Sequence, residues 1–129
     1  MLDETLVYRL LKVVKTYRFR IAAGLAPLGL HPGQEFLLNQ LWREDGLTQS
    51  ELIARLGVEP PTVTKTLQRL ERAGIVTRTQ EQRTRVHLTE QGKALREPVE
   101  AVWREADEDL RAGLSDEDRK VLDRLLEAT

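Results

Sequence analysis

A basic helical segment carries the side chains best suited to bind another molecule. Between Pro60 and Gly74, one helical face is polar or basic, with Thr62, Lys65, Arg69 and Arg72. A second face of the same segment is apolar, with Val63, Leu67, Leu70 and Ala73. We therefore predict a helix with one face in the core and one cationic face. The alternative is an ordinary amphipathic helix whose charged side only contacts water.

Both ends of this segment favour a helix of that length. It opens with Pro60 and Pro61, and proline suits the first helical turn, where no intrahelical N–H is lost. Gly74 suits the left-handed backbone position just after a last turn.

A short helix precedes the basic segment at the spacing of a helix-turn-helix. Thr48 and Glu51 form a capping-box pair, and Gly57 ends the helix that they begin. Its expected inward residues are Leu52, Ile53 and Leu56. Two residues separate Gly57 from Pro60. Two short helices joined by a tight turn with glycine, the second with a basic outer face, form a helix-turn-helix.

The sequence after Gly74 predicts a two-stranded hairpin. Residues 75–79 and 84–88 are β-branched, alternating runs separated by residues 80–83. A hairpin directly after a recognition helix is the wing of a winged helix. The tip and return strand carry Arg83 and Arg85, and Arg78 lies on the outgoing strand. We expect the exposed arginines at the tip to contact phosphates or a minor groove. The alternative is that they are solvated charges protecting an edge strand.

Amphipathic helices are predicted before this region. The first covers residues 3 to about 25 and has a wide apolar stripe. We expect part of that stripe to be buried against a second copy of the chain, and burial within one chain is the alternative. A second helix opens after residues 31–33, and its expected apolar side consists of Phe36, Leu37, Leu38, Leu41 and Trp42.

Two further helices are predicted after the hairpin. One begins at Thr89, and Pro98 inside it predicts a bend or a lost hydrogen bond near Ala94. The last is capped by Ser115. Its apolar residues are expected to point inward: Val121, Leu122, Leu125 and Leu126. The predicted fold class is mainly α with a small β-hairpin wing.

Composition predicts a soluble, cytoplasmic protein of one domain with helical extensions. The 129 residues are 40% hydrophobic, which is enough for a core, and carry a net charge of −1. Charged residues interrupt every apolar run near the N-terminus, which argues against a signal peptide or a membrane span. Residues 48–92 carry seven basic and five acidic side chains, whereas residues 93–129 carry seven and eleven. The basic centre can therefore attract phosphates although the whole chain is not basic.

The sequence gives no support for catalysis, a metal site or a cofactor. Cysteine is absent, which excludes disulfides, thiolate metal sites and a cysteine nucleophile. His31 and His87 lie far apart, and no carboxylate cluster at ligand spacing accompanies them. There is neither a glycine-rich phosphate loop nor a serine nucleophile elbow. We therefore expect a protein that is not an enzyme and has no metal or cofactor.

Four stretches of sequence carry a family resemblance. They are LTQSELIARLGV at residues 47–58, TVTK at 62–65, LERAGIV at 70–76 and LTEQG at 88–92. Together they closely resemble the MarR family of bacterial transcriptional regulators, and the resemblance spans nearly the whole chain. It implies a winged helix-turn-helix domain at residues 31–92, with an N-terminal dimerisation helix at 1–30 and C-terminal dimerisation helices at 93–129.

The resemblance implies a homodimer that sets two winged helices on a pseudo-palindromic operator in double-stranded DNA. Members usually repress genes and release DNA when a small, often phenolic or anionic, ligand binds between the dimerisation and DNA-binding parts. Some members instead activate transcription. The alternative is a dimeric helical adaptor that binds a protein partner through its acidic C-terminal third and does not use the winged helix for DNA.

The expected DNA-binding residues combine side chains that read base edges with side chains and helix ends that hold phosphates. In the recognition helix they are Pro61, Thr62, Thr64, Lys65, Gln68, Arg69 and Arg72. At the preceding helix N-terminus they are Thr48, Gln49 and Ser50, where helix capping is the alternative role for Thr48. In the wing they are Arg83 and Arg85.

Two features depart from the family pattern. The tip at residues 80–83 is shorter than usual by about two residues and lacks the acidic partner of the wing arginine, whose counterpart is Arg83. Pro60 and Pro61 stand where the family often has a polar or basic side chain. They fix the backbone but donate no side-chain hydrogen bond.

The candidate ligand-binding residues come from the helices that the resemblance places around the ligand crevice. They are Tyr17, Arg18, His31 and Trp42. Core packing is the alternative for the aromatic members. We expect Arg18 or Arg20 to pair with an anionic ligand.

Overall fold

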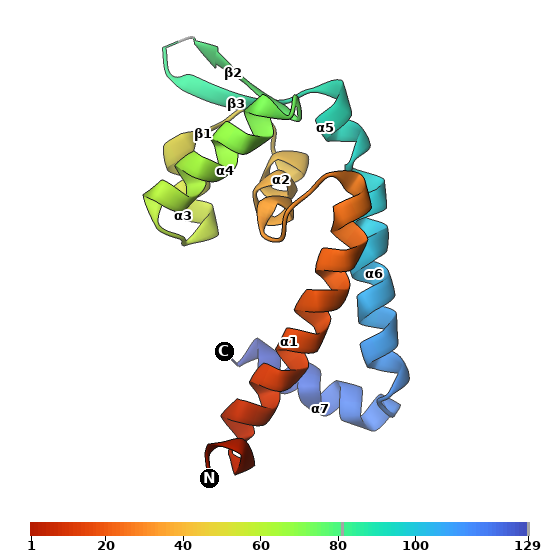
Figure 1. The fold of residues 1–129 in the computed structure, drawn as a ribbon. Coiled ribbons are helices and arrows are strands. Elements are labelled where there is room, and N and C mark those ends of the chain that lie inside the picture. Colours follow the sequence, from red (N-terminus) through yellow and green to blue (C-terminus); the bar gives the residue numbers. More distant parts are fainter. Residues whose placement is uncertain (81, 129) are drawn as a thin grey trace.

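The computed structural model describes residues 1–80 and 82–128 and separates a winged-helix region from a helical extension (Figure 1). Helices α1 and α6 lie side by side and lead away from the region that contains the strands. Helix α7 then turns back from the far end of α6. Glu81, at the tip of the predicted wing, lies outside the described residues.

The chain contains seven α-helices and three strands in its described part. The helices are α1 (Leu6–Leu25), α2 (Gln34–Arg43), α3 (Gln49–Leu56), α4 (Pro60–Arg72), α5 (Glu90–Ala94), α6 (Arg96–Ala112) and α7 (Asp116–Glu127). The strands are β1 (Leu47–Thr48), β2 (Val76–Gln80) and β3 (Thr84–Leu88). Short 3₁₀ turns occupy Leu2–Glu4 and Ala26–Leu28.

The wing is a three-stranded antiparallel sheet in the order β1-β3-β2. The predicted hairpin is confirmed, with Val76 opposite Leu88 and Gln80 opposite Thr84. The prediction of two strands was incomplete, because Thr48 of β1 also pairs with Arg85 of β3. A strand of two residues is too short to show the alternation that identifies strands in a sequence.

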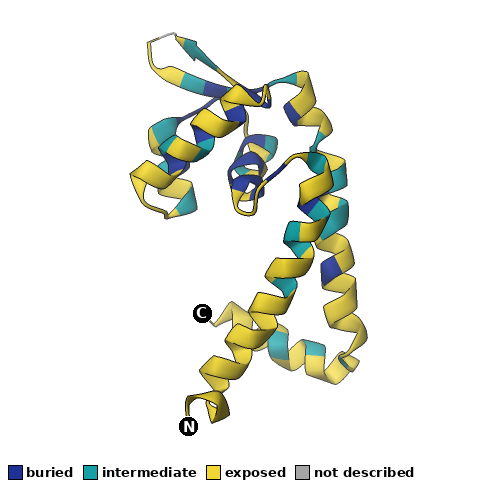
Figure 2. Cartoon of the chain, viewed as in Figure 1, coloured by how far each residue is buried: buried dark blue, intermediate teal, exposed yellow. Residues whose placement is uncertain are grey.

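The core lies where α2, α3 and α4 meet the sheet. The dark blue residues of Figure 2 gather there. The fully buried leucines come from all three helices, and they include Leu37, Leu38, Leu41, Leu52, Leu67 and Leu70. Ile53 and Leu56 of α3 are half-buried against this cluster. The winged-helix region therefore has a core of its own, which can hold the recognition helix in place.

Two residues of the winged-helix region that were expected inside are exposed. Ala73 was wrongly placed on the buried face of the basic helix: α4 ends at Arg72, and Ala73 is the residue that follows the last turn. Phe36 was wrongly placed on the buried side of α2, and 52% of its surface is exposed. Its ring instead packs against Trp103 on α6 in a T-shaped arrangement, with ring centroids 5.6 Å apart.

Glycines end both helices of the helix-turn-helix, as predicted. Gly57 after α3 and Gly74 after α4 have positive φ angles of 63° and 77°. After α4, the Ile75 N–H donates to the Leu70 carbonyl at 2.9 Å, a bond that requires a left-handed residue between them. This turn directs the chain from the recognition helix straight into β2.

The helix predicted to begin at Thr89 is broken into α5 and α6 at Leu95. The predicted disturbance near Ala94 is confirmed, because α5 ends at that residue. Pro98 is the third residue of α6, where its missing N–H costs no helical bond.

The helical extension is joined by a charged contact between α1 and α6. The Asp109 carboxylate accepts hydrogen bonds from the Tyr17 hydroxyl at 2.9 Å and the Arg20 guanidinium at 2.7 Å. These two contacts lower the pKa of Asp109, the guanidinium acting more strongly, and the bond to Asp109 raises the pKa of the Tyr17 hydroxyl. The cluster fixes the two long helices against each other.

Much of the extension's apolar surface faces solvent in the single chain. On α1 the exposed residues include Leu6, Val7, Leu10, Leu11 and Val14. The inward direction predicted for the last helix is wrong for a single chain, because Val121, Leu125 and Leu126 are exposed and Leu122 is half-buried. Apolar surface on this scale is typical of an interface. None of the helices in the described part of the chain combines the length and apolar character that crossing a membrane requires.

Substituting Gly92 should destabilise the fold. A Cβ atom there would lie 2.2 Å from the Ile75 carbonyl oxygen, so the backbone between α5 and the sheet would have to move. We expect Gly92→Ala to lower the free energy of unfolding by about 1–3 kcal/mol, the cost of overpacking. The measurement is denaturant unfolding at fixed protein concentration.

Gly113→Ala is the matched control, because its Cβ would lie 3.7 Å from the nearest atom and its φ is −82°. Equal stability of the two variants would contradict the prediction.

Candidate nucleic-acid interface

Helix α4 presents its cationic face to solvent while its apolar side is buried. We call this face the cationic stripe; it consists of Thr62, Lys65, Arg69 and Arg72. Val63, Leu67 and Leu70 are each at most 1% exposed. The polar and basic residues on the other side are exposed: Thr62, Lys65, Gln68, Arg69 and Arg72. Pro61 is also exposed at the first turn. The predicted division of this helix into a core face and a cationic face is therefore confirmed for all these residues.

The N-terminal end of α4 has no side-chain cap of its own. Glu59 stands at the N-cap position, and its side chain makes no capping hydrogen bond in the described structure. Pro60 and Pro61 contribute no backbone N–H. The Thr62 N–H donates to the Glu59 carbonyl at 2.9 Å, and the Thr64 hydroxyl donates to the Pro60 carbonyl at 3.1 Å.

Thr48 caps α3, as the sequence predicted. Its hydroxyl accepts a hydrogen bond from the Glu51 N–H at 3.2 Å, and the Glu51 carboxylate accepts one from the Thr48 N–H at 3.2 Å. Thr48 is only 7% exposed. The hydrogen bonds from the Thr48 backbone and hydroxyl lower the pKa of Glu51. Since its hydroxyl is buried and used, Thr48 is placed as a cap and not toward a phosphate.

The other two residues at this helix N-terminus are placed differently. Ser50 is exposed, as a phosphate contact requires. Gln49 is half-buried, and its Nε2 lies 2.8 Å from the Thr64 hydroxyl oxygen on α4. The structure thus places Gln49 against the recognition helix.

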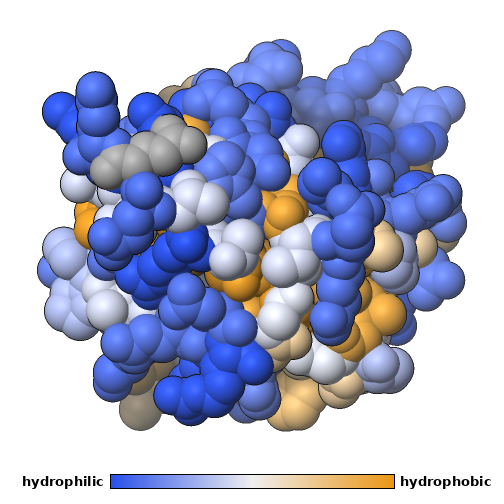
Figure 3. Space-filling view, turned by 90° about the horizontal axis from the view of Figure 1, so that it is seen from above, coloured by the Kyte–Doolittle hydropathy of each residue, from blue (hydrophilic) through white to orange (hydrophobic). Residues whose placement is uncertain are grey.

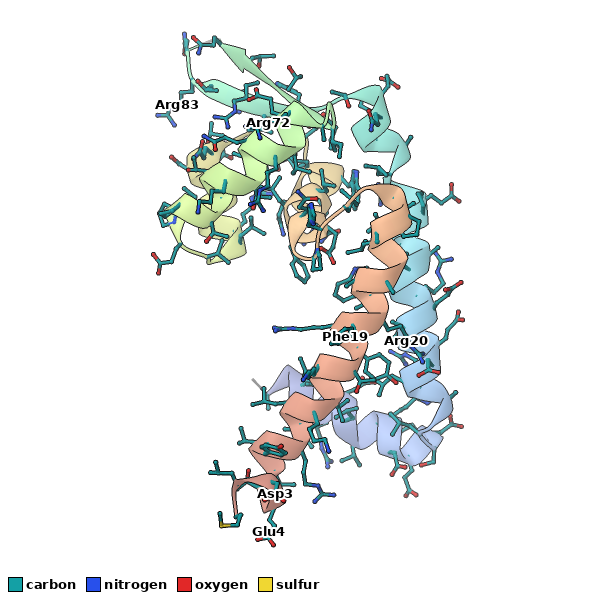
Figure 4. All side chains as sticks on the ribbon, in the orientation of Figure 1. Asp3, Glu4, Phe19, Arg20, Arg72 and Arg83 are labelled. Carbon is teal, nitrogen blue, oxygen red and sulfur yellow. The ribbon has the colours of Figure 1, made fainter. Side chains whose placement is uncertain are left out.

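The wing arginines have different surroundings. Arg83 is exposed and projects from the wing at the same end of the molecule as Arg72 of α4, whereas Arg20 lies far away on α1 (Figure 4). Arg85 is half-buried and donates to the Gly46 carbonyl at 2.9 Å. The Nε atom of Arg78 lies 3.6 Å from the Glu71 carboxylate on α4. Arg85 and Arg78 therefore hold the wing against its neighbours.

Asp45 anchors the base of the wing, a role that the sequence analysis missed. One carboxylate oxygen accepts hydrogen bonds from the N–H groups of Gly46 and Leu88, each at 3.0 Å. The other lies 4.0 Å from Nδ1 of His87 on β3. An Asp-Gly pair in the sequence indicates a turn, but nothing in it identifies a strand residue 43 positions later as a donor.

The face that carries the wing is predominantly hydrophilic. Figure 3 looks down on this end of the molecule, and hydrophilic residues cover most of it. Guanidinium and ammonium groups bind phosphates, while threonine and glutamine side chains can also meet base edges. Together, the exposed residues of α4 and Arg83 form an arrangement that can bind the backbone of a nucleic acid and read its bases.

A cavity of about 350 Å³ lies beside the recognition helix, between α2, α3 and α4. Its polar lining includes His31, Arg55 and Arg69, and its apolar lining includes Phe36 and Val58. Arg55 also forms an ion pair with Glu44 at 3.0 Å. The combination of cations and apolar side chains suits a small anionic aromatic molecule.

The structure does not bring the four predicted ligand-binding residues together in this cavity. His31 lines it, whereas Tyr17 and Arg18 lie on α1 and Tyr17 is bonded to Asp109. The Trp42 indole N–H donates to the Gly92 carbonyl at 3.0 Å, which joins α2 to α5. The guanidinium of Arg20, which was expected along with Arg18 as a partner for an anionic ligand, is paired with Asp109 in this structure.

Within residues 1–80 and 82–128, no group of three or more histidine, aspartate or glutamate side chains is arranged to hold a metal ion.

Comparisons with known proteins place this geometry in a family. The sequence model of the MarR family matches residues 30–84. The HTH-type transcriptional repressor Rv2887 of Mycobacterium tuberculosis is 33% identical over 129 residues, covering 97% of this chain and 93% of that protein. The crystal structure of Rv2887 in complex with DNA has a TM-score of 0.79 and 34% identity, covering 98% of each chain. The structure of Rv2887 in complex with salicylic acid has a TM-score of 0.71 and 35% identity, covering 98% of this chain and 96% of the other.

Proposed function

Since this chain belongs to the MarR family of transcriptional regulators, we propose that it is a homodimeric repressor of this type. It binds a pseudo-palindromic operator in double-stranded DNA, and a small anionic ligand releases it. The observation that carries this proposal is the exposed cationic stripe of α4 beside the exposed Arg83 of the wing. The relative Rv2887 has been crystallised with DNA, which supports the same use of the winged helix here.

The recognition helix supplies most of the contacts in this proposal. A helix fits the major groove, where each base pair presents its own pattern of donors and acceptors. Lys65 and Arg69 bind guanine edges or phosphates, and Thr62 contacts bases or backbone. Gln68 and Arg72 extend the contact along the exposed side of α4.

Contacts outside the recognition helix mainly orient the protein on the duplex. Ser50 binds a phosphate at the N-terminus of α3, where free N–H groups and the helix dipole favour an anion. Arg83 reaches an adjacent minor groove or its phosphates. Thr48 and Arg85 act indirectly in this proposal, because their polar groups are used in the cap and at the base of the wing.

A second copy of the chain completes the DNA-binding unit. The exposed apolar residues of α1 and α7 lie in the extension, away from the recognition helix, so their burial leaves the cationic stripe free. A two-fold dimer then presents two recognition helices about one helical turn, roughly 10 bp, apart. We divide the chain accordingly into the winged-helix domain at 31–92 and dimerisation segments at 1–30 and 93–129.

The adaptor alternative explains less of the structure. A protein-binding adaptor has no use for a cationic stripe held outward by a fully buried apolar face. The acidic residues of the C-terminal third lie on the extension, distant from that stripe. We propose no catalytic activity for this chain, because the family and the relatives that it matches are transcriptional regulators.

The cavity beside α4 is the proposed ligand site. It is lined by Arg55 on α3 and Arg69 on α4. An anion bound there pairs with the same Arg69 guanidinium that contacts DNA in this proposal. Competition for this guanidinium gives a physical reason for ligand-induced release. The salicylic acid complex of Rv2887 supports an aromatic carboxylate as the ligand class.

Substituting Arg69 and Arg83 should separate base reading from backbone binding. In a gel-shift titration with DNA from upstream of the protein's own gene, we expect Arg69→Ala to weaken specific binding by about 1–3 kcal/mol. Arg83→Ala should weaken binding to operator and to unrelated duplex by a similar factor. Wild-type affinity should fall steeply with salt, because phosphate contacts release counterions.

Arg104→Ala on α6 is the control for removing an exposed arginine outside the interface. Binding that is independent of salt, or equal loss in all three variants, would refute this assignment of roles.

Introducing a charge on α1 should split the dimer. Leu10 is 62% exposed in the single chain, and the proposed interface buries it in both copies. Leu10→Glu should raise the dimer dissociation constant at least about tenfold, since each lost leucine burial is worth roughly 1.5–3 kcal/mol. Sedimentation velocity over a concentration series measures this. Gln91→Glu, an exposed position on α5, should leave the association unchanged, and a monomeric wild type would end the proposal.

Removing the charge of Arg55, which lines the cavity, should reduce the response to salicylate. Arg55→Gln keeps the polar character of the side chain but removes the charge that pairs with a carboxylate. About tenfold more salicylate should then be needed to release the operator, as measured by fluorescence anisotropy. Arg18→Gln is the matched control on α1. A loss of response in the Arg18 variant alone would move the ligand site to the helical extension.

A further inference from the structure

A side-chain hydrogen bond links the two helices of the helix-turn-helix. Gln49, the first residue of α3, approaches the Thr64 hydroxyl in α4 with 2.8 Å between Nε2 and Oγ1. Both side chains are half-buried, which protects the bond from competing water. Because the bond spans 15 residues of sequence, it constrains the turn between the helices as well as their packing.

The hydroxyl geometry fixes the direction of this bond. Thr64 donates its single hydroxyl proton to the Pro60 carbonyl at 3.1 Å. A hydroxyl has one proton and two lone pairs, so toward Gln49 it can only accept. Gln49 is therefore the donor through Nε2. With its proton given to Pro60 and a lone pair occupied by Gln49, the Thr64 hydroxyl is poorly available to a base or a phosphate.

This bond acts at the first turn of α4, which has no side-chain cap. The Glu59 side chain forms no cap, and the two prolines that follow contribute no N–H. The N-terminal residues of a recognition helix are also the ones that contact base edges. Their position in a groove therefore depends on contacts from outside the helix.

The residue that supplies the contact is itself firmly held. Gln49 directly follows Thr48, which caps α3 together with Glu51 and pairs with Arg85 in the sheet. The wing therefore contacts the cap of α3, and the residue after this cap contacts the first turn of α4. A displacement of the first turn would have to break this connection.

We propose that Gln49 is a positioning residue for DNA recognition, which acts through Thr64 to set the first turn of α4 against α3. This inference rests on the proposed DNA-binding function and replaces the direct phosphate contact expected for Gln49. Loss of the bond lowers affinity for the operator more than for unrelated duplex, because base contacts require the correct helix position and phosphate contacts tolerate small shifts.

A double-mutant cycle tests the proposal. Gln49→Leu and Thr64→Val keep the side-chain size and remove the bond. Each should weaken operator binding about three- to tenfold, the effect of one hydrogen bond. The double variant should bind as either single variant does, because both substitutions remove the same interaction. Thr64→Ser keeps the hydroxyl and should restore most of the affinity and the preference for operator.

Thr66→Val is the matched control on the same helix. Its hydroxyl donates to the Thr62 carbonyl at 2.8 Å, the same bond to the residue four positions back that Thr64 makes. Only a small change in operator binding is expected from it. Thermal unfolding of every variant checks that each one is folded to the same extent before its DNA affinity is compared with that of the others.

Additive losses in the double variant would overturn the proposal, since they would mean that Gln49 and Thr64 contact DNA independently. A loss of operator affinity in Gln49→Leu without a loss of operator affinity in Thr64→Val would also overturn it. These outcomes differ from failure of the proposed function, in which the wild-type protein itself binds no duplex at low salt.

Discussion

The burial of three apolar side chains on α4 determines how the rest of the molecule is used. Val63, Leu67 and Leu70 are almost completely removed from solvent, and each such burial contributes roughly 1.5–3 kcal/mol. Because the helix repeats every 3.6 residues, fixing this face also fixes the opposite one. Rotating α4 to hide Arg69 would expose the leucines. The cationic stripe is therefore held outward by the core beneath it.

Hydrogen bonds to a few polar side chains then set the position of that helix. Thr48 and Glu51 hold the start of α3, and Asp45 ties the loop before β1 to β3 at the base of the wing. The α3 cap is energetically modest, since capping interactions contribute about 1 kcal/mol. Packing fixes which face of α4 is outward, while the polar contacts fix where that face lies relative to the wing.

The sequence identified the elements that depend on local patterns and missed those that depend on distant partners. Helix α4 was predictable because its prolines, its terminal Gly74 and its apolar spacing agree. Strand β1 was not, because two residues acquire their conformation only by pairing with β3. Likewise, the hydrogen bond from Arg85 to the Gly46 carbonyl could not be predicted, because the two residues lie 39 positions apart in the sequence. The partner that covers the apolar face of α7 could not be predicted. The spacing of apolar residues locates such a face but does not identify the molecule that packs against it.

The junction between the winged helix and the extension connects DNA binding to the rest of the chain. At this junction the Trp42 indole donates to the Gly92 carbonyl, and the Gly92 backbone lies too close to Ile75 to admit a Cβ. The short helix α5 is thus fixed to α2 on one side and to the sheet on the other, and α6 follows after a single residue, Leu95. In a dimer joined through the extension, a tilt of α6 about this residue changes the distance between the two recognition helices. On the proposed operator, whose half-sites have a fixed spacing along the duplex, such a tilt would lower affinity without altering a DNA-contacting side chain.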